Sequence, residues 1–187
     1  MIIPHIWTLM GFKSVGKSTI GVALARALTC DFFDLDRLIE EQYHSQYRSS
    51  LTYRQIMHRH GEKFFSTLEH RALTTMIRHQ SENCILALGG RTILYEKNRS
   101  VLKSNRIKCT LIYLKADKNE VFSRMMHHGR PAFIPTTENA RDFFNALWNK
   151  RIPVYQSFAN ITIWNMGDIK KITNEILYQL RKRGELS

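Results

Sequence analysis

Short apolar runs alternate along this chain with segments in which apolar residues recur every three or four positions. The runs predict buried β-strands, and the periodic segments predict amphipathic helices. Five such runs occur, at residues 6–10, 32–36, 84–88, 109–114 and 160–164. This alternation is typical of an α/β fold. We therefore expect a single domain, residues 1–187, with a five-stranded parallel sheet flanked by helices on both faces.

The connecting segments carry helical periodicity of different strength. Residues 53–60 and 62–78 predict two helices that meet at Gly61, and residues 96–104 predict an exposed helix. Further helices are expected at residues 20–28, 37–43, 117–126, 138–150 (before Pro153) and 169–180. Residues 127–137 contain Gly129, Pro131 and Pro135 with little apolar periodicity, which is typical of a mobile lid.

The most informative motif follows the first apolar run. Residues 11–19, Gly-Phe-Lys-Ser-Val-Gly-Lys-Ser-Thr, match the phosphate-binding loop pattern and lie between a predicted strand and a predicted helix. Gly11 and Gly16 allow a sharp turn that points consecutive N–H groups at phosphates. Lys17 places a charge on the outer phosphates, and the Ser18 hydroxyl can ligate Mg²⁺. The motif predicts a protein that binds a nucleoside triphosphate.

Other nucleotide-binding motifs are missing from the sequence. A GTPase would be expected to carry Asn-Lys-x-Asp for guanine, and the nearest segment, residues 114–117, lacks the asparagine. A motor ATPase usually places an acid at the end of a central strand, whereas the runs at 84–88 and 109–114 end in Gly-Gly and in lysine. These observations favour a small-molecule kinase over a switch or a motor.

Asp34 and Asp36 end the second apolar run. Side chains repeat every two residues in a strand, so both carboxylates would lie on one face beside the γ-phosphate. One could hold the metal while the other binds an acceptor hydroxyl or takes its proton. The alternative is that one or both only cap a helix that begins near Arg37.

Composition and charge indicate which kinds of binding partner to expect. The formal net charge is +12, but the basic residues are scattered, with no run longer than residues 181–183. Scattered charge favours an anionic small substrate over nucleic acid. No apolar run is long enough to cross a bilayer, and the N-terminus lacks the basic segment of a signal peptide. Cys30, Cys84 and Cys109 lie at or within apolar segments without a close pair, which suits buried thiols in a reducing cytoplasm.

Taken together, these motifs resemble the shikimate kinase family over about residues 6–165. The resemblance rests on segments in the family's order and spacing: the phosphate-binding loop, Phe-x-Asp-x-Asp at 32–36, Gly-Glu-x-x-Phe at 61–65, Gly89-Gly90 and Arg130-Pro131. It implies ATP-dependent phosphorylation of the 3-hydroxyl of shikimate in aromatic amino-acid biosynthesis. It also implies a fold like that of the nucleoside-monophosphate kinases, with Mg²⁺ as cofactor. We expect a cytoplasmic monomer whose acceptor-binding helical region spans about residues 36–78.

The resemblance also implies a role for individual residues at the nucleotide end. Lys17 would contact the transferred phosphate, and Arg130 resembles the lid arginine that closes over ATP. Ser18 and Asp34 would serve Mg²⁺. The remaining loop residues implied to bind ATP are Gly11, Ser14, Val15, Gly16 and Thr19. The turn at residues 165–168 would lie near adenine.

At the acceptor end, Asp36 would bind hydroxyl groups and could act as the base. Gly89 and Gly90 would offer backbone N–H groups to the substrate. Arg151 resembles the arginine that holds the shikimate carboxylate.

Three features depart from the family pattern. Lys13-Ser14 replaces Met-Gly inside the loop, which still leaves a valid phosphate-binding loop. Ser66 stands where the family carries an arginine that pairs with the substrate carboxylate, and serine cannot supply such a charge-assisted contact. Arg91 stands where the family has the last glycine of a Gly-Gly-Gly turn.

The last two departures suggest a hypothesis. Arg91 would reach into the acceptor pocket and restore the charge missing at Ser66; the alternative is that Arg91 faces solvent. Lys63, one helical turn before Ser66, is a weaker substitute. Two other functions stay open: a related kinase for another polyol or sugar acid, and a non-catalytic nucleotide-binding protein that retains the fold.

Overall fold

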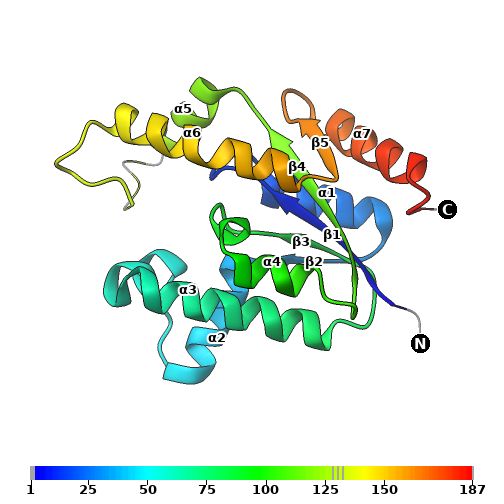
Figure 1. Ribbon diagram of the computed structural model, residues 1–187, viewed down its shortest axis with the longest axis horizontal. Helices are drawn as coiled ribbons and strands as arrows, with labels where there is room; N and C mark the ends of the chain where they lie inside the picture. The colour runs from blue at the N-terminus through cyan, green and yellow to red at the C-terminus, as the bar shows by residue number, and fades with distance from the viewer. Residues whose placement is uncertain (1–2, 128, 130, 132, 187) are drawn as a thin grey trace.

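A five-stranded parallel sheet forms the centre of the protein in this computed structural model (Figure 1). The strands are β1 (His5–Met10), β2 (Asp31–Asp34), β3 (Cys84–Ala87), β4 (Lys108–Lys115) and β5 (Ile161–Trp164), and their order across the sheet is β2-β3-β1-β4-β5. The structure describes residues 3–127, 129, 131 and 133–186. The predicted α/β fold class, with its five parallel strands, is confirmed.

The central strands β3 and β1 are largely apolar and buried because helices cover both of their faces. All four residues of β3 are buried, and β1 is buried from Ile6 to Met10. Strand β1 pairs with β3 on one side and with β4 on the other, so that Ile6 lies opposite both Cys84 and Cys109. The three cysteines are free thiols; only Cys84 is buried, so the expectation of buried thiols was wrong for Cys30 and Cys109, which are half-buried.

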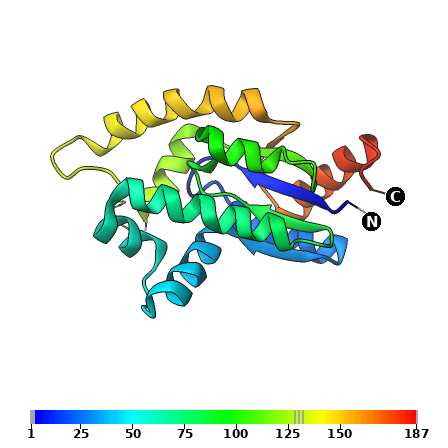
Figure 2. The same ribbon diagram turned by 60° about the horizontal axis from the view of Figure 1, so that its bottom comes forward.

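Helices surround the sheet on both sides. They are α1 (Lys17–Leu28), α2 (Leu35–Tyr47), α3 (Tyr53–His79), α4 (Glu96–Leu102), α5 (Lys118–His127), α6 (Ala140–Phe158) and α7 (Ile169–Lys182), with a short 3₁₀ helix, η1 (Thr92–Leu94). Helices α1 and α7 pack together on one face of the sheet, and α3 and α4 pack together on the opposite face (Figure 2). No helix in the described ranges is both long enough and apolar enough to span a membrane.

Two expectations about element boundaries and one about exposure were wrong. Strand β2 ends at Asp34, so Asp36 belongs to the first turn of α2. Helix α6 continues through Pro153 and does not stop before it. The lost hydrogen bond is outweighed by the burial of Phe144, Arg151 and Tyr155 along the helix. Helix α4 is not simply exposed, because Asn98 and Leu102 are buried.

Gly61 produces the predicted break between the two helical stretches of α3. Its backbone angles are φ 77° and ψ 176°, outside the helical region and accessible mainly to glycine. The residues of α3 before and after Gly61 therefore run in different directions along the same side of the domain (Figure 1).

A carboxylate near the C-terminus holds the two ends of the chain together. The Glu185 carboxylate accepts hydrogen bonds from the indole N–H of Trp7 at 3.2 Å and from the Thr110 hydroxyl at 2.8 Å. It also lies 3.3 Å from Nε2 of His5. Its side chain is only 11% exposed, so these contacts are shielded from water and the last turn is fixed against β1 and β4.

We predict that Glu185→Ala lowers the free energy of unfolding by about 1–3 kcal/mol, because two partly buried donors lose their acceptor. Urea denaturation of the purified protein measures the change. Glu175→Ala is the matched control: Glu175 is exposed on α7 and, among the described residues, hydrogen-bonds only to Gln179, so its loss should change stability by less than about 0.5 kcal/mol. Equal losses for both variants would contradict the role given to Glu185.

Candidate functional site

The phosphate-binding loop connects β1 to α1 and is confined by the ends of two neighbouring strands. Gly11 has φ 149°, and a Cβ atom there would lie 2.7 Å from the carbonyl oxygen of Leu114. Gly16 has φ 98°, and a Cβ atom there would lie 2.8 Å from Nδ2 of Asn165, which donates a hydrogen bond to the carbonyl of Val15. Both glycines are therefore required by backbone angle and by space.

Lys17 folds back over this loop. Its ammonium donates hydrogen bonds to the carbonyl oxygens of Gly11, at 3.1 Å, and of Phe12, at 3.0 Å. Burial lowers the pKa of Lys17 to about 8, and the nearby carboxylates of Asp36 and Asp34 limit the fall. At neutral pH Lys17 remains mostly protonated, as a phosphate-binding charge requires.

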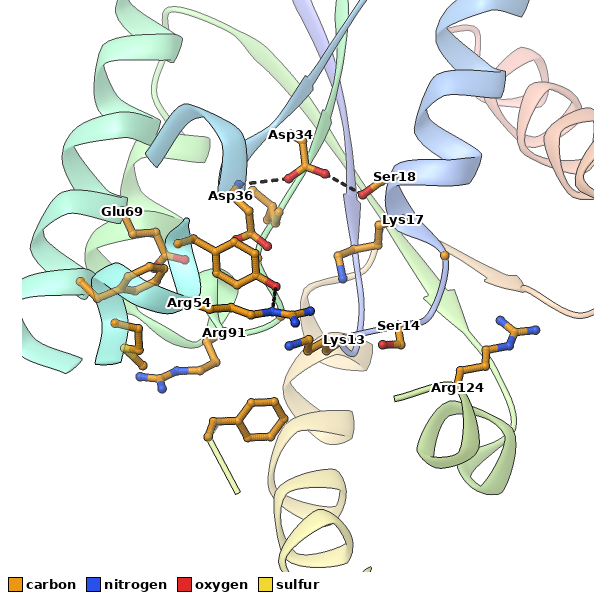
Figure 3. Close-up of a pocket in the computed structure, with 18 of the residues that line it drawn as sticks. Lys13, Ser14, Lys17, Ser18, Asp34, Asp36, Arg54, Glu69, Arg91 and Arg124 are labelled. Carbon is orange, nitrogen blue, oxygen red and sulfur yellow. Dashed lines mark hydrogen bonds between the residues drawn. The ribbon is translucent and has the colours of Figure 1, made fainter. Parts of the chain in front are cut away.

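Asp34 links α1 to α2. One carboxylate oxygen accepts the Ser18 hydroxyl at 2.6 Å, and the other accepts the backbone N–H of Asp36 at 3.0 Å (Figure 3). Asp34 is therefore the N-cap of α2. The prediction that Asp34 and Asp36 share a strand face was wrong, because the chain turns into helix between them.

Asp36 lies inside the site, in the first turn of α2. Burial raises the pKa of its carboxyl to about 6, and the neighbouring charge of Asp34 adds to the rise while Lys17 opposes it. A carboxylate whose pKa is raised in this way is a better proton acceptor than an ordinary aspartate. Asp36 thus lies in the same cavity as Lys17, as the sequence suggested, but it is placed there by the first turn of α2 and not by a strand.

One cavity of about 1000 Å³ contains most of the predicted site residues (Figure 3). It is lined by Ser14, Gly16, Lys17, Ser18, Thr19, Asp34, Asp36, Gly89, Gly90, Arg91 and Arg151. Gly11, Val15 and Ser66 do not line it. Arg130 lies outside the described residues. The structure therefore brings together, in one cavity, residues from the carboxyl ends of β1, β2 and β3, which is where ligands bind in parallel sheets.

A buried glutamate that sequence reasoning missed holds the turn after β3. Glu69 of α3 is 3% exposed and accepts hydrogen bonds from the Thr92 hydroxyl, at 2.7 Å, and from Asn98 Nδ2, at 3.3 Å. A Cβ atom on Gly89 would lie 3.1 Å from the Glu69 carboxylate and 3.3 Å from that of Asp36. The signal was present: Glu69 is an acid on the apolar face of the helix at 62–78, between Phe65 and Ala72.

Arg151 lies in the interior of the site on α6. It is 7% exposed, and its guanidinium carbon is 5.2 Å from the centre of the Phe12 ring. Tyr155, one turn later, donates a hydrogen bond to the carbonyl of Gly90. Because Pro153 does not end α6, the helix presents Arg151 to the cavity and Tyr155 to the turn after β3.

Ser66 and Arg91 occupy different surroundings. Ser66 is buried away from the cavity, and its carbonyl accepts a hydrogen bond from Lys97 Nζ at 3.0 Å. Arg91 does line the cavity, as the hypothesis of a relocated charge required. Its guanidinium, however, forms an ion pair with Glu62 and a hydrogen bond to the Tyr95 hydroxyl. Arg91 is therefore neither directed to solvent nor an unpaired cation.

Residues between α5 and α6 reach the same cavity. Phe133 lines it, and the Lys13 ammonium lies 5.3 Å from the Phe133 ring centre and 5.9 Å from that of Tyr53. The adjacent Ile134 is 2% exposed. The predicted lid segment thus packs over the phosphate-binding loop through Lys13, one of the departures noted in the sequence.

Comparison with known proteins gives a consistent family assignment. The family model described as "Shikimate kinase" matches residues 13–181. A shikimate kinase of Macrococcus caseolyticus is 32% identical over 171 residues, covering 91% of this chain and 93% of that protein. A shikimate kinase of Burkholderia lata is 31% identical over 180 residues, covering 95% of this chain and 91% of that protein.

A solved structure extends the likeness to three dimensions. Shikimate kinase from Acinetobacter baumannii in complex with shikimate has a TM-score of 0.79 at 28% identity, covering 99% of this chain and 96% of that one.

We predict that Asp36→Asn stabilises the protein at pH 8 by roughly 1–3 kcal/mol, because each unit of pKa shift corresponds to about 1.4 kcal/mol. The pKa of Asp36 is about 6 in the folded protein and 3.8 ordinarily, so the fold disfavours the charged form. The free energy of unfolding of the wild type should therefore decrease as the pH is raised from about 4 to about 6. Below about pH 4 the carboxyl is protonated in both states, so the variant should no longer be more stable than the wild type.

Thermal unfolding across this pH range measures the difference between the two proteins. Asp31→Asn, an exposed aspartate at the start of β2, serves as the control. A variant that is less stable than the wild type at pH 8 would show that the Asp36 carboxylate is not disfavoured by its surroundings.

Proposed function

The chain belongs to the shikimate kinase family, and we propose that it transfers the γ-phosphoryl group of ATP to the 3-hydroxyl of shikimate, giving shikimate 3-phosphate. The observation that carries the proposal is the single cavity in which Lys17 and Ser18 of the phosphate-binding loop face Asp36, Gly90 and Arg151. Donor and acceptor could lie end to end there, which in-line phosphoryl transfer requires.

The nucleotide would occupy the end of the cavity formed by the loop and the start of α1. The backbone N–H groups of residues 14–19 would bind the phosphates, and the ammonium of Lys17 would balance charge on the transferred group. Lys17 would exchange its two carbonyl contacts for phosphate oxygens, since both ligands compete for the same donor.

The hydroxyl of Ser18 and the carboxylate of Asp34 fit a Mg²⁺ ion. Both are hard oxygen ligands 2.6 Å apart, and Mg²⁺ typically takes its remaining ligands from water and from the nucleotide phosphates. In keeping with that sparse protein ligation, the described residues contain no cluster of three or more His, Cys, Asp or Glu side chains that could hold a metal. When bound, the ion would neutralise phosphate charge.

The acceptor would occupy the end of the cavity between α2, α3 and the turn after β3. Asp36 would accept a hydrogen bond from the hydroxyl and take its proton, for which the raised pKa suits it. Gly89 and Gly90 would bind the acceptor through backbone N–H groups. Arg151 would bind its carboxylate, and burial of the guanidinium strengthens such a pair.

The segment at residues 127–137 would act as the lid, and Arg130 within it would close over ATP. The contact between Phe133 and Lys13 supports this part of the proposal, because it joins the segment to the phosphate-binding loop. Residues 36–78 would form the acceptor-binding region. Closure of the lid against the acceptor-binding region would exclude water from the phosphoryl group being transferred.

A kinase for another polyol or sugar acid is the second candidate. It is favoured by Ser66, which removes an acceptor-binding arginine from the family pattern, and by the paired state of Arg91. A gluconokinase from Sinorhizobium meliloti has the same fold, with a TM-score of 0.58 at 17% identity, although that likeness concerns the fold alone.

A coupled assay with ATP, Mg²⁺ and shikimate tests the proposal, and we expect turnover that Lys17→Met lowers by at least about 1000-fold, because the charge on the transferred phosphate is lost. Lys171→Met, an exposed lysine on α7, should retain full activity. Turnover of other hydroxy acids but not shikimate would favour the second candidate. ATP binding without transfer to any acceptor would contradict both.

A further inference from the structure

We propose that Arg54 is a specificity-determining residue that binds the carboxylate of the acceptor. The inference rests on the proposed function, since it names the residue that recognises the anionic group of the same substrate. Arg54 was not among the residues that the sequence pointed to. It is the second residue of α3 and lines the cavity.

The side chain of Arg54 is directed into the cavity. Figure 3 shows its guanidinium extending from α3 toward Lys13 of the phosphate-binding loop. The two cations are close enough for Arg54 to lower the pKa of Lys13, together with the larger effect of burial. Asp36 opposes this repulsion, but its carboxylate is the group that would bind the acceptor hydroxyl.

Arg54 differs from Arg91, because no acid of the described residues forms an ion pair with it. Among the described residues it forms no salt bridge, and its one hydrogen bond runs from Nε to the neutral hydroxyl of Tyr53 at 3.1 Å. The first turn of α3 also contains no acidic residue, so the positive end of the helix adds to the charge of Arg54. An anion in the cavity would relieve this repulsion.

The guanidinium is held in place before any ligand arrives. It lies 5.6 Å from the ring centre of Tyr53, whose backbone N–H donates to Glu40 of α2 at 2.8 Å. Thr52 and Gln55 form a capping box that fixes the start of α3. Within the described part of the chain the terminal nitrogens of Arg54 have no hydrogen-bond partner, and they suit the two oxygens of a carboxylate.

Two basic residues on the same side of the site as Ser66 are committed elsewhere. Lys97 donates to the carbonyl of Ser66, and Arg91 is paired with Glu62. Arg151 lies on α6, so Arg54 would approach the carboxylate from a different element. The geometry therefore points to Arg54, and not to Arg91, as the cation that compensates for Ser66.

Arg54→Gln tests the proposal with two acceptors, shikimate and its uncharged methyl ester. For shikimate we expect KM to rise about 10- to 100-fold, as for the loss of a charge-assisted hydrogen bond, with KM for ATP changed less than about threefold. For the ester, kcat/KM should be nearly the same in variant and wild type, because the ester offers no charge. Arg59→Gln, an exposed arginine of α3 that does not line the cavity, should match the wild type with both acceptors.

Several outcomes would overturn the proposal. They are an unchanged KM for shikimate in Arg54→Gln, an equal loss for acid and ester, which would indicate a structural effect, and a larger loss in Arg91→Gly, which would assign the carboxylate to Arg91. Calorimetric binding of shikimate separates this proposal from the proposed function. Binding by the wild type that Arg54→Gln weakens supports the role of Arg54 even without turnover, whereas equal binding, or none in either protein, overturns it.

Discussion

The two hydrogen bonds of the Asp34 carboxylate hold the site together. One oxygen caps α2 through the N–H of Asp36, and the other accepts the hydroxyl of Ser18 at the start of α1. Helices α1 and α2 are thereby set against a single side chain at the end of β2. Asp36 depends on the same contact, because the cap determines where α2 begins and thus where its first carboxylate lies.

Much of the fold and of the nucleotide end could be predicted from the sequence. Apolar runs marked all five strands, and the glycines at 11 and 16 identified a loop whose backbone admits no side chain there. Boundaries were harder, because they depend on tertiary contacts. The buried side chains of α6 stabilise the helix beyond Pro153. The cap at Asp34 starts α2 at Leu35, although the apolar run that predicted a strand extends to residue 36.

The other end of the cavity was less predictable from the sequence. Whether an arginine there can bind an anion depends on which acidic side chains lie beside it in the folded protein. From the sequence, Arg91 could either reach into the acceptor pocket or face solvent, and nothing pointed to Arg54. In the structure, Glu62 neutralises Arg91, whereas among the described residues Arg54 hydrogen-bonds only to the Tyr53 hydroxyl and lies near enough to Lys13 to lower its pKa. Glu69 shows the same limit. Its position on an apolar helix face was visible, but the two donors that justify its burial lie 23 and 29 residues further along the chain.

The contact between Asn165 and Val15 has a consequence for the order in which the protein is made. A side chain at the end of the last strand supports the phosphate-binding loop across 150 residues of sequence. The loop is synthesised well before the segment that supports its shape, so the contact must form late relative to the loop itself. The phosphate-binding loop therefore lacks this hydrogen bond until Asn165 has been synthesised and β5 has joined the sheet.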